Sequence, residues 1–176
     1  MTKDFSNSII LPDNLPVIDT TEFTPIDPKY LKLIYIRIAI VCLIMLVAGL
    51  GFGLLVKDKF PLYIYWIIGG FMLTVIIYSF IIARLSFPYR GYLIREKDIA
   101  YKQGLIRFTH TSIPYIRVQH VELIQGVIAK KMDLATIKIY TAGGSSDDLS
   151  IPGLPIETAR QIREFLTGKI SSDDND

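Results

Sequence analysis

This chain of 176 amino acids contains few histidines and cysteines, two side-chain types that enzymes often use for metal binding and nucleophilic catalysis. It has two histidines, His110 and His120, and one cysteine, Cys42. A zinc site needs three or four protein ligands at suitable spacing, and two histidines without a nearby cysteine do not provide them. Cys42 has no disulfide partner, and its place in an apolar run indicates ordinary packing. We therefore expect no metal site.

Nucleophilic chemistry has no better support. Ser112, His120 and Asp133 are the residue types of a catalytic triad, but most chains of this length contain such a set. There is no Gly-x-Ser-x-Gly turn and no phosphate-binding glycine motif. The Gly-Gly-Ser-Ser stretch at 143–146 could hold an anion with backbone N–H groups, although a hairpin turn is the better interpretation. We expect no catalytic residues and no cofactor, and keep a membrane-proximal enzyme as a minor alternative.

Two long uncharged runs dominate the first half of the chain. Residues 38–56 and 60–83 contain no charged side chain, and only Lys57, Asp58 and Lys59 separate them. As helices they would be about 28 and 36 Å long, close to the roughly 30 Å hydrocarbon core of a bilayer. We predict a transmembrane hairpin of helices at about 34–56 and 60–83. The alternatives, a buried hairpin of a soluble protein and a cleaved signal peptide, fit the lengths and positions less well.

Basic residues flank the hairpin unequally. Seven Lys or Arg residues lie beside the outer ends of the two runs, and two lie in the turn. The positive-inside rule then places both termini of this multi-pass membrane protein in the cytoplasm. Neither run contains Asp, Glu or His, which argues against a transport path. Four glycines are candidates for helix packing, within the hairpin or between subunits: Gly49, Gly53, Gly69 and Gly70.

The remaining sequence predicts an arm, a domain and a tail. Residues 1–28 are acidic and contain four prolines, yet their aliphatic residues suggest an arm that docks on the protein; a mobile leader is the alternative. Residues 171–176 form an acidic tail. Between hairpin (29–86) and tail we expect a domain at 87–170. Its strands are predicted at 91–95, 98–102, 105–111, 116–123, 135–142 and 149–151.

A helix closes the predicted domain. Pro155 and Glu157 suit a helix start, and Gly168 lies near the expected end. An apolar stripe with a period of 3.6 residues follows Pro155, and it must be buried against the strands. The fold class is therefore α+β: a transmembrane hairpin followed by an antiparallel barrel or sandwich that a C-terminal helix caps. Residues 127–134 could be a short helix or a bulged connection.

This pattern resembles the YdbS-like family of bacterial pleckstrin-homology membrane proteins. The similarity covers residues 30–170 and is most specific at 113–144. The residues that carry it are Pro114, Arg117, Gln119-His120-Val121, Gly126, Leu134-Ala135-Thr136, Ile139, Thr141-Ala142-Gly143-Gly144 and Ile151-Pro152-Gly153-Leu154. The resemblance implies a pleckstrin-homology fold of two near-orthogonal sheets, no established catalytic activity, and in some members a role in envelope stress tolerance. Members often occur beside a larger relative with several such domains.

Two surfaces are candidates for binding. Arg117, Gln119 and His120 form a polar element that either contacts a partner protein or ties one sheet to a neighbouring loop. The candidates for contact with anionic lipid are Arg84, Arg90, Lys130 and Lys131. Lys97, Lys102 and Arg107 lack the compact spacing of inositol-phosphate-binding pleckstrin-homology domains, so the resemblance does not imply headgroup recognition.

These observations together predict a non-catalytic, membrane-anchored module. We expect it to serve protein–protein assembly or recognition on the cytoplasmic side of the inner membrane, with an anionic-lipid sensor as the alternative. Its expected partners are the bilayer and either a second copy of the chain or a larger multi-domain relative. The modest net charge of +2, without a basic aromatic cluster, gives no support for nucleic-acid binding.

Overall fold

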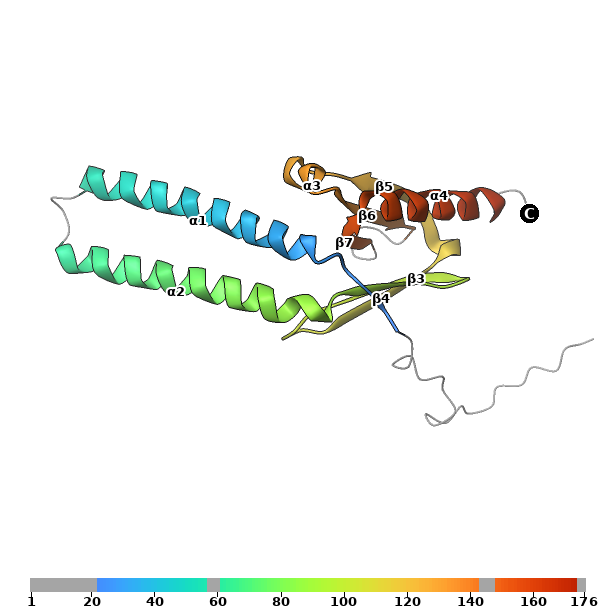
Figure 1. The fold of residues 1–176 in the computed structure, drawn as a ribbon, viewed down its shortest axis with the longest axis horizontal. Coiled ribbons are helices and arrows are strands. Elements are labelled where there is room, and N and C mark those ends of the chain that lie inside the picture. Colours follow the sequence, from blue (N-terminus) through green and yellow to red (C-terminus); the bar gives the residue numbers. More distant parts are fainter. Residues whose placement is uncertain (1–21, 57–60, 143–147, 174–176) are drawn as a thin grey trace, which may run out of the picture.

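The computed structural model describes residues 22–56, 61–142 and 148–173. Two long helices, α1 (Lys29–Val56) and α2 (Leu62–Ser86), run side by side and project from one end of a small domain (Figure 1). α1 begins several residues before the predicted position 34. Asp27 explains the early start, because its Oδ1 accepts the N–H of Lys29 at 2.7 Å and Pro28 suits the first helical turn.

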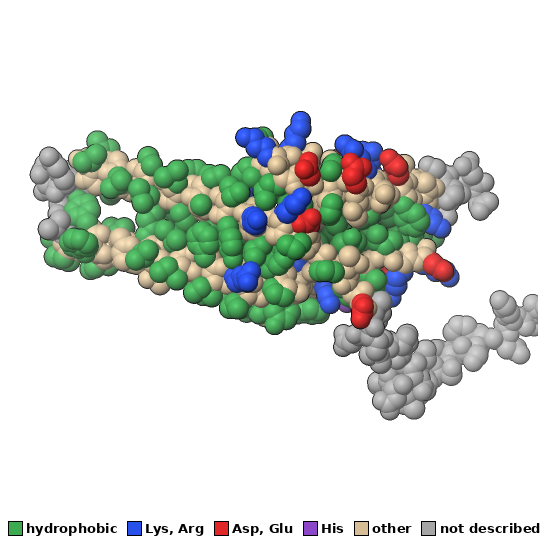
Figure 2. Space-filling view, in the orientation of Figure 1, with side chains coloured by type: hydrophobic (Ala, Val, Ile, Leu, Met, Phe, Trp, Pro, Cys, Tyr) green, Lys and Arg blue, Asp and Glu red, His purple; other side chains and the backbone are tan. Residues whose placement is uncertain are grey.

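Both helices are long and apolar enough to cross a membrane, and their most apolar stretches are not buried within the protein. Large side chains such as Leu55 and Trp66 are exposed along their length, and Figure 2 shows the hydrophobic covering of this half of the molecule. A hairpin buried in a soluble core would instead hide these groups. The hydroxyls of Thr74 and Ser79 donate to the carbonyls of Gly70 and Val75, so they are satisfied within α2 itself.

The domain consists of two antiparallel sheets and a capping helix, which confirms the predicted α+β class. The first sheet has the order β1-β2-β3-β4, and the second has the order β5-β6-β7. The strands are β1 (Thr24–Pro25), β2 (Gly91–Ile94), β3 (Asp98–Gln103), β4 (Thr109–Pro114), β5 (Val118–Ile124), β6 (Leu134–Thr141) and β7 (Leu149–Pro155). Short helices precede β2, precede β5 and follow β5: η3 (Phe87–Tyr89), η4 (Tyr115–Arg117) and α3 (Val127–Lys131).

The C-terminal helix α4 (Ile156–Asp173) covers the second sheet (Figure 1). Its stripe of Ala159, Ile162 and Leu166 is buried in one core with residues from both sheets. The helix continues past Gly168, where we expected its end. A Cβ at Gly168 would meet nothing within 4 Å, so no close packing stops the helix there.

Several strand boundaries differ from the sequence prediction, and β7 continues to Pro155, four residues past its expected end at 151. β4 begins at Thr109, whereas residues 105–107 form a bend instead of the start of a strand. Gly104, at φ +119°, turns the chain so tightly that a Cβ would lie 1.8 Å from the Arg107 carbonyl oxygen. The strand expected from residue 116 begins at Val118, because η4 turns the chain from the first sheet to the second.

The base of α1 lies within the domain. Ile26, Tyr30 and Leu33 are buried and belong to the same core as the sheets. Thr24 and Pro25 pair with β2, and the Asp27 N–H donates to the Gly153 carbonyl of β7 at 3.2 Å. Residues 22–28 of the expected arm therefore dock on the domain, while residues 1–21 lie outside the described part of the chain.

Gly153 permits this docking. Its φ is +75°, and a Cβ there would lie 2.4 Å from Tyr30 Cγ and 2.6 Å from Ile26 Cγ2. These are impossible contacts, and the left-handed backbone adds strain for any other residue. The close approach of β7 to the base of α1 thus requires glycine.

Gly153→Ala should destabilise the domain by about 2–4 kcal/mol, since it combines backbone strain with overpacking. The measurement is the midpoint of urea unfolding in detergent, followed by circular dichroism. Gly168→Ala is the matched control, because it adds the same methyl group to an open helical position and should be neutral or slightly stabilising. Equal midpoints for the two variants would contradict this account of the α1 base.

Burial raises the pKa of Tyr101, a core residue of β3, and the charge of Arg90 opposes the shift without cancelling it. The neutral phenol is thus favoured in the fold. The neutral Tyr101 side chain contributes fully to the stability of the fold below about pH 10, which is the pKa of tyrosine in an unfolded chain. This contribution is lost as the pH rises through the higher pKa of Tyr101 in the folded protein.

We expect the loss of stability above about pH 10 to be shallower in Tyr101→Phe than in the unaltered protein, because phenylalanine has no proton to release. Urea unfolding midpoints measured from pH 8 to pH 11 test this. Parallel curves for the two proteins would show that Tyr101 does not couple folding to alkaline pH.

Candidate partner-binding surface

The predicted polar element lies at the start of an edge strand. Arg117 ends η4, and Gln119 and His120 follow in β5; all three are exposed. Among the described strands, β5 pairs with β6 alone, so its other edge is not covered by a strand. The register of this pair shifts between Val118 and His120, which places Gln119 at an irregularity of the ladder.

His120 belongs to a polar group on the outward face of β5 and β6. We call His120, Glu122, Lys138 and Tyr140 the β5–β6 face. His120 lies opposite Tyr140 in the ladder, and Glu122 lies opposite Lys138. The intervening Ile137 and Ile139 point into the core, where they are fully buried. The alternation of these residue types in the sequence was the signal that could have located Lys138 and Tyr140.

Short polar contacts join the four side chains. Tyr140 Oη donates to Glu122 Oε2 at 3.0 Å, and Glu122 Oε1 lies 3.6 Å from His120 Nε2. The Lys138 ammonium lies 4.3 Å from the centre of the Tyr140 ring, and hydrogen bonding to Tyr140 raises the pKa of Lys138. The face therefore holds a positive charge beside an aromatic ring and a carboxylate.

The His120 side chain makes its described contacts within this sheet, with Glu122 and Tyr140. Gln119 is exposed. The backbone also joins η4 to the end of β6 here, because the Ala142 N–H donates to the Arg117 carbonyl at 3.3 Å. The partner-binding role of Arg117, Gln119 and His120 stays a prediction.

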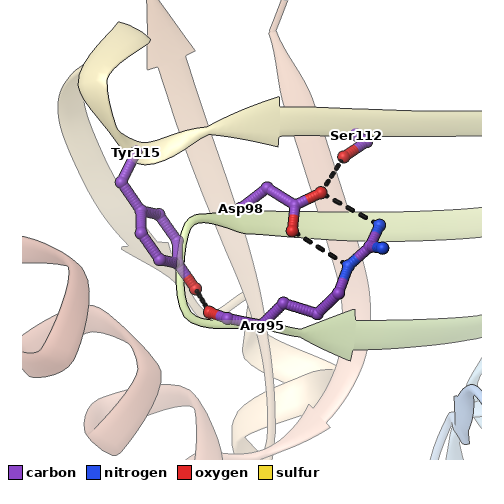
Figure 3. A network of polar contacts seen from close by, with 4 residues as sticks. All are labelled: Arg95, Asp98, Ser112 and Tyr115. Atoms are coloured by element: carbon purple, nitrogen blue, oxygen red, sulfur yellow. Dashed lines mark hydrogen bonds and ion pairs between the residues drawn. The ribbon is translucent and has the colours of Figure 1, made fainter.

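A second polar cluster, at the β2–β3 turn, was not identified from the sequence (Figure 3). Arg95 Nε lies 2.9 Å from Asp98 Oδ1, and Arg95 Nη2 donates to Asp98 Oδ2 at 3.0 Å. The Ser112 hydroxyl also donates to Asp98. Tyr115 Oη donates to the Arg95 carbonyl at 2.6 Å. Ser112 is thus engaged with Asp98, and the cluster ties η4 to the first sheet. We interpret it as structural, since its contacts join the β2–β3 turn to β4 through Ser112 and to η4 through Tyr115.

The four candidate lipid-contacting residues have different environments. Arg84 in α2 is exposed, as are Lys130 and Lys131 in α3. Arg90 is half-buried: its guanidinium lies 5.9 Å from the Tyr30 ring centre, and its charge acts on Tyr101. Arg90 therefore contacts the base of α1 and the first sheet.

Three of the four candidate packing glycines line a space between the helices, and Gly70 does not. A cavity of about 740 Å³ separates α1 from α2 and is lined by apolar side chains together with Gly49, Gly53 and Gly69. A Cβ at Gly53 would lie 3.5 Å from Tyr65 of α2, whereas one at Gly49, Gly69 or Gly70 would meet nothing within 4 Å. Nearer the domain, Tyr35 and Phe80 join the two helices at 5.2 Å between ring centres.

No group of three or more His, Cys, Asp or Glu side chains suited to a metal ion occurs in the described residues. The triad types are not assembled either. Ser112 bonds to Asp98, His120 faces Glu122, and the Asp133 carbonyl accepts the N–H of Ile156 at the start of α4.

Comparison with known proteins agrees with this architecture. The family model described as "Bacterial PH domain" matches residues 28–170. The UPF0699 transmembrane protein YdbS of Bacillus subtilis (strain 168) is 31% identical over 159 residues, which cover 87% of this chain and 95% of that protein. No solved structure matches the chain. The helix pair, the two antiparallel sheets and the capping helix are thus the parts of a YdbS-like membrane protein, and the chain belongs to the bacterial PH domain family.

Proposed function

We propose that this protein is a membrane-anchored module for protein–protein assembly, and that it binds its partner through the open edge of β5 and the β5–β6 face. The observation that carries the proposal is the edge of β5, with which no described strand pairs. It is flanked by Ile116, which is 82% exposed, and by the exposed Gln119 and His120.

An open strand edge presents backbone N–H and C=O groups that an extended segment of another chain can pair with. Backbone pairing supplies affinity, and the neighbouring side chains supply selectivity. The β5–β6 face carries both signs of charge and an aromatic ring beside this edge, so it can discriminate between partners by charge. The partner that we propose is another PH-domain chain, either a second copy or a larger relative.

The site offers no comparable argument for catalysis. The polar groups on the β5–β6 face are exposed or half-buried and bond to one another, whereas catalytic groups usually sit in a cleft that excludes water. We further propose that the domain and both termini lie in the cytoplasm, at the inner membrane. Any role in envelope stress tolerance would follow from the assembly.

Photo-crosslinking in living cells tests the proposed contact at the edge of β5. The photoreactive amino acid benzoylphenylalanine replaces Gln119 in the full chain. Irradiation should give an adduct with a second copy of the chain or with a larger PH-domain protein, identified by mass spectrometry. Gln161 is the matched control: it is also an exposed glutamine, but it lies on α4.

Adducts at Gln119 but not at Gln161 would support the proposal. The absence of adducts at both positions, or equal adducts at both, would reject the β5 edge as the contact. His120→Ala should reduce the Gln119 adduct several-fold without changing the unfolding midpoint, since the His120 side chain is exposed.

Sidedness is tested with single cysteines introduced into a Cys42→Ala background. We expect a cysteine at Ser150, which is exposed on β7, to react with a membrane-impermeant maleimide only after the cells are lysed. A cysteine replacing Asp58, in the turn between the two apolar runs, should react in intact cells. The opposite labelling pattern would invert the orientation.

A further inference from the structure

One end of the domain faces the membrane-spanning helices. β2 begins at Gly91, directly after α2 and η3, and Gly91 lies opposite Lys102 in β3. The next β3 residue, Gln103, pairs with Thr109 of β4, so the turn at 104–108 extends past Gly91 toward the helices. Figure 1 shows this hairpin reaching back, along the long axis of the molecule, to the level of the last turns of α2.

The turn carries large apolar side chains into solvent. Ile106 is 79% exposed and Phe108 is 64% exposed, whereas Leu105 is less exposed. Arg107 lies between Ile106 and Phe108 in the sequence. The tight backbone of Gly104 fixes this shape. We call Leu105, Ile106 and Phe108 the β3–β4 tip.

A second apolar projection lies at the same end of the domain. β5 runs from η4 to Ile124, and α3 follows at the level of the first turns of α1 (Figure 1). Val127 in α3 is 81% exposed, and Ile124 beside it is also exposed. The connection is braced, because Gln125 Nε2 donates to the Leu134 carbonyl at 2.9 Å. We call Ile124 and Val127 the α3 tip.

We propose that these two tips insert into the interfacial region of the bilayer, so that the domain rests on the membrane that its helices cross. Two observations identify lipid as the occupant. First, both tips project toward the exposed apolar surface of α1 and α2, so burial in lipid would be continuous with the membrane spans. Second, exposed basic residues flank the tips: Arg107 lies within the first, Lys130 and Lys131 follow the second, and Arg84 lies at the end of α2.

This combination is the one that amphipathic membrane-surface elements use. Apolar side chains at the boundary of headgroups and acyl chains leave water, while adjacent lysine and arginine side chains remain among anionic headgroups. Asp133 is exposed near Lys131 and offsets part of the positive charge. Insertion of the tips depends on the membrane spans and not on the β5 contact, so either proposal can fail alone.

Site-directed fluorescence in the full-length protein tests the inference. Ile106→Cys and Val127→Cys, each in a Cys42→Ala background, are labelled with the polarity-sensitive dye NBD and reconstituted into vesicles of phosphatidylethanolamine and phosphatidylglycerol. Glu96→Cys is the matched control: Glu96 is also exposed, but it lies in the turn between β2 and β3, at the opposite end of the first sheet and outside the proposed partner-binding surface.

We expect blue-shifted emission at positions 106 and 127, with quenching by doxyl-labelled lipid several-fold stronger than at position 96. Aqueous iodide should quench the position 96 probe most strongly. The proposal is overturned if all three probes behave as water-exposed. It is also overturned if, in detergent without lipid, probes 106 and 127 are as shielded from iodide as they are in vesicles, and if this shielding increases with protein concentration. That result would assign the tips to a protein contact.

Discussion

The burial of the first turns of α1 within the domain is the contact on which the arrangement of this protein depends. Ile26, Tyr30 and Leu33 share a core with both sheets, and Gly153 allows β7 to approach them closely. α2 enters the first sheet through the short helix η3, so both helices are joined to the domain without a long linker. A domain held at two points cannot swing freely, and its membrane-facing end is therefore a defined surface.

The two sheets present different surfaces. The first sheet is extended by β1 from the N-terminal side, and its turn at 104–108 projects toward the helices. The second sheet is covered by α4 on its core side and leaves the edge of β5 and the β5–β6 face open. The membrane contact and the protein contact that we propose therefore use different parts of one small domain, which meet at Ile124, the last residue of β5.

Much of this architecture could be predicted from the sequence, for identifiable reasons. The length of the apolar runs and the 3.6-residue stripe of α4 are strong periodic signals, and the alternation in residues 135–142 located β6 correctly. The base of α1 was not foreseen as core. Lys29 and Lys32 lie beside Tyr30 and Leu33, and this mixture looks like the ordinary charged flank of a membrane helix.

The exposed tips escaped prediction for a related reason. Residues 105–111 alternate in a way that suggests a strand, and only the positive φ of Gly104 converts their first part into a turn. Periodicity reports which residues share a face, but it does not report which face meets water. The Arg95–Asp98–Ser112 cluster likewise joins residues from two strands, and such pairing depends on a register that the sequence does not specify.

The contact between Ile26 and Gly153 also imposes an order on biogenesis. A ribosome makes the hairpin long before it makes β7, so the helices enter the membrane while the partner surface of Tyr30 and Leu33 does not yet exist. Tyr30 and Leu33 therefore lack their packing partners until nearly the whole polypeptide has left the ribosome. The contacts between β7 and the base of α1 consequently form late and join residues far apart in the sequence. A nascent chain that stops before β7 would insert its helices but could not complete the fold of the domain.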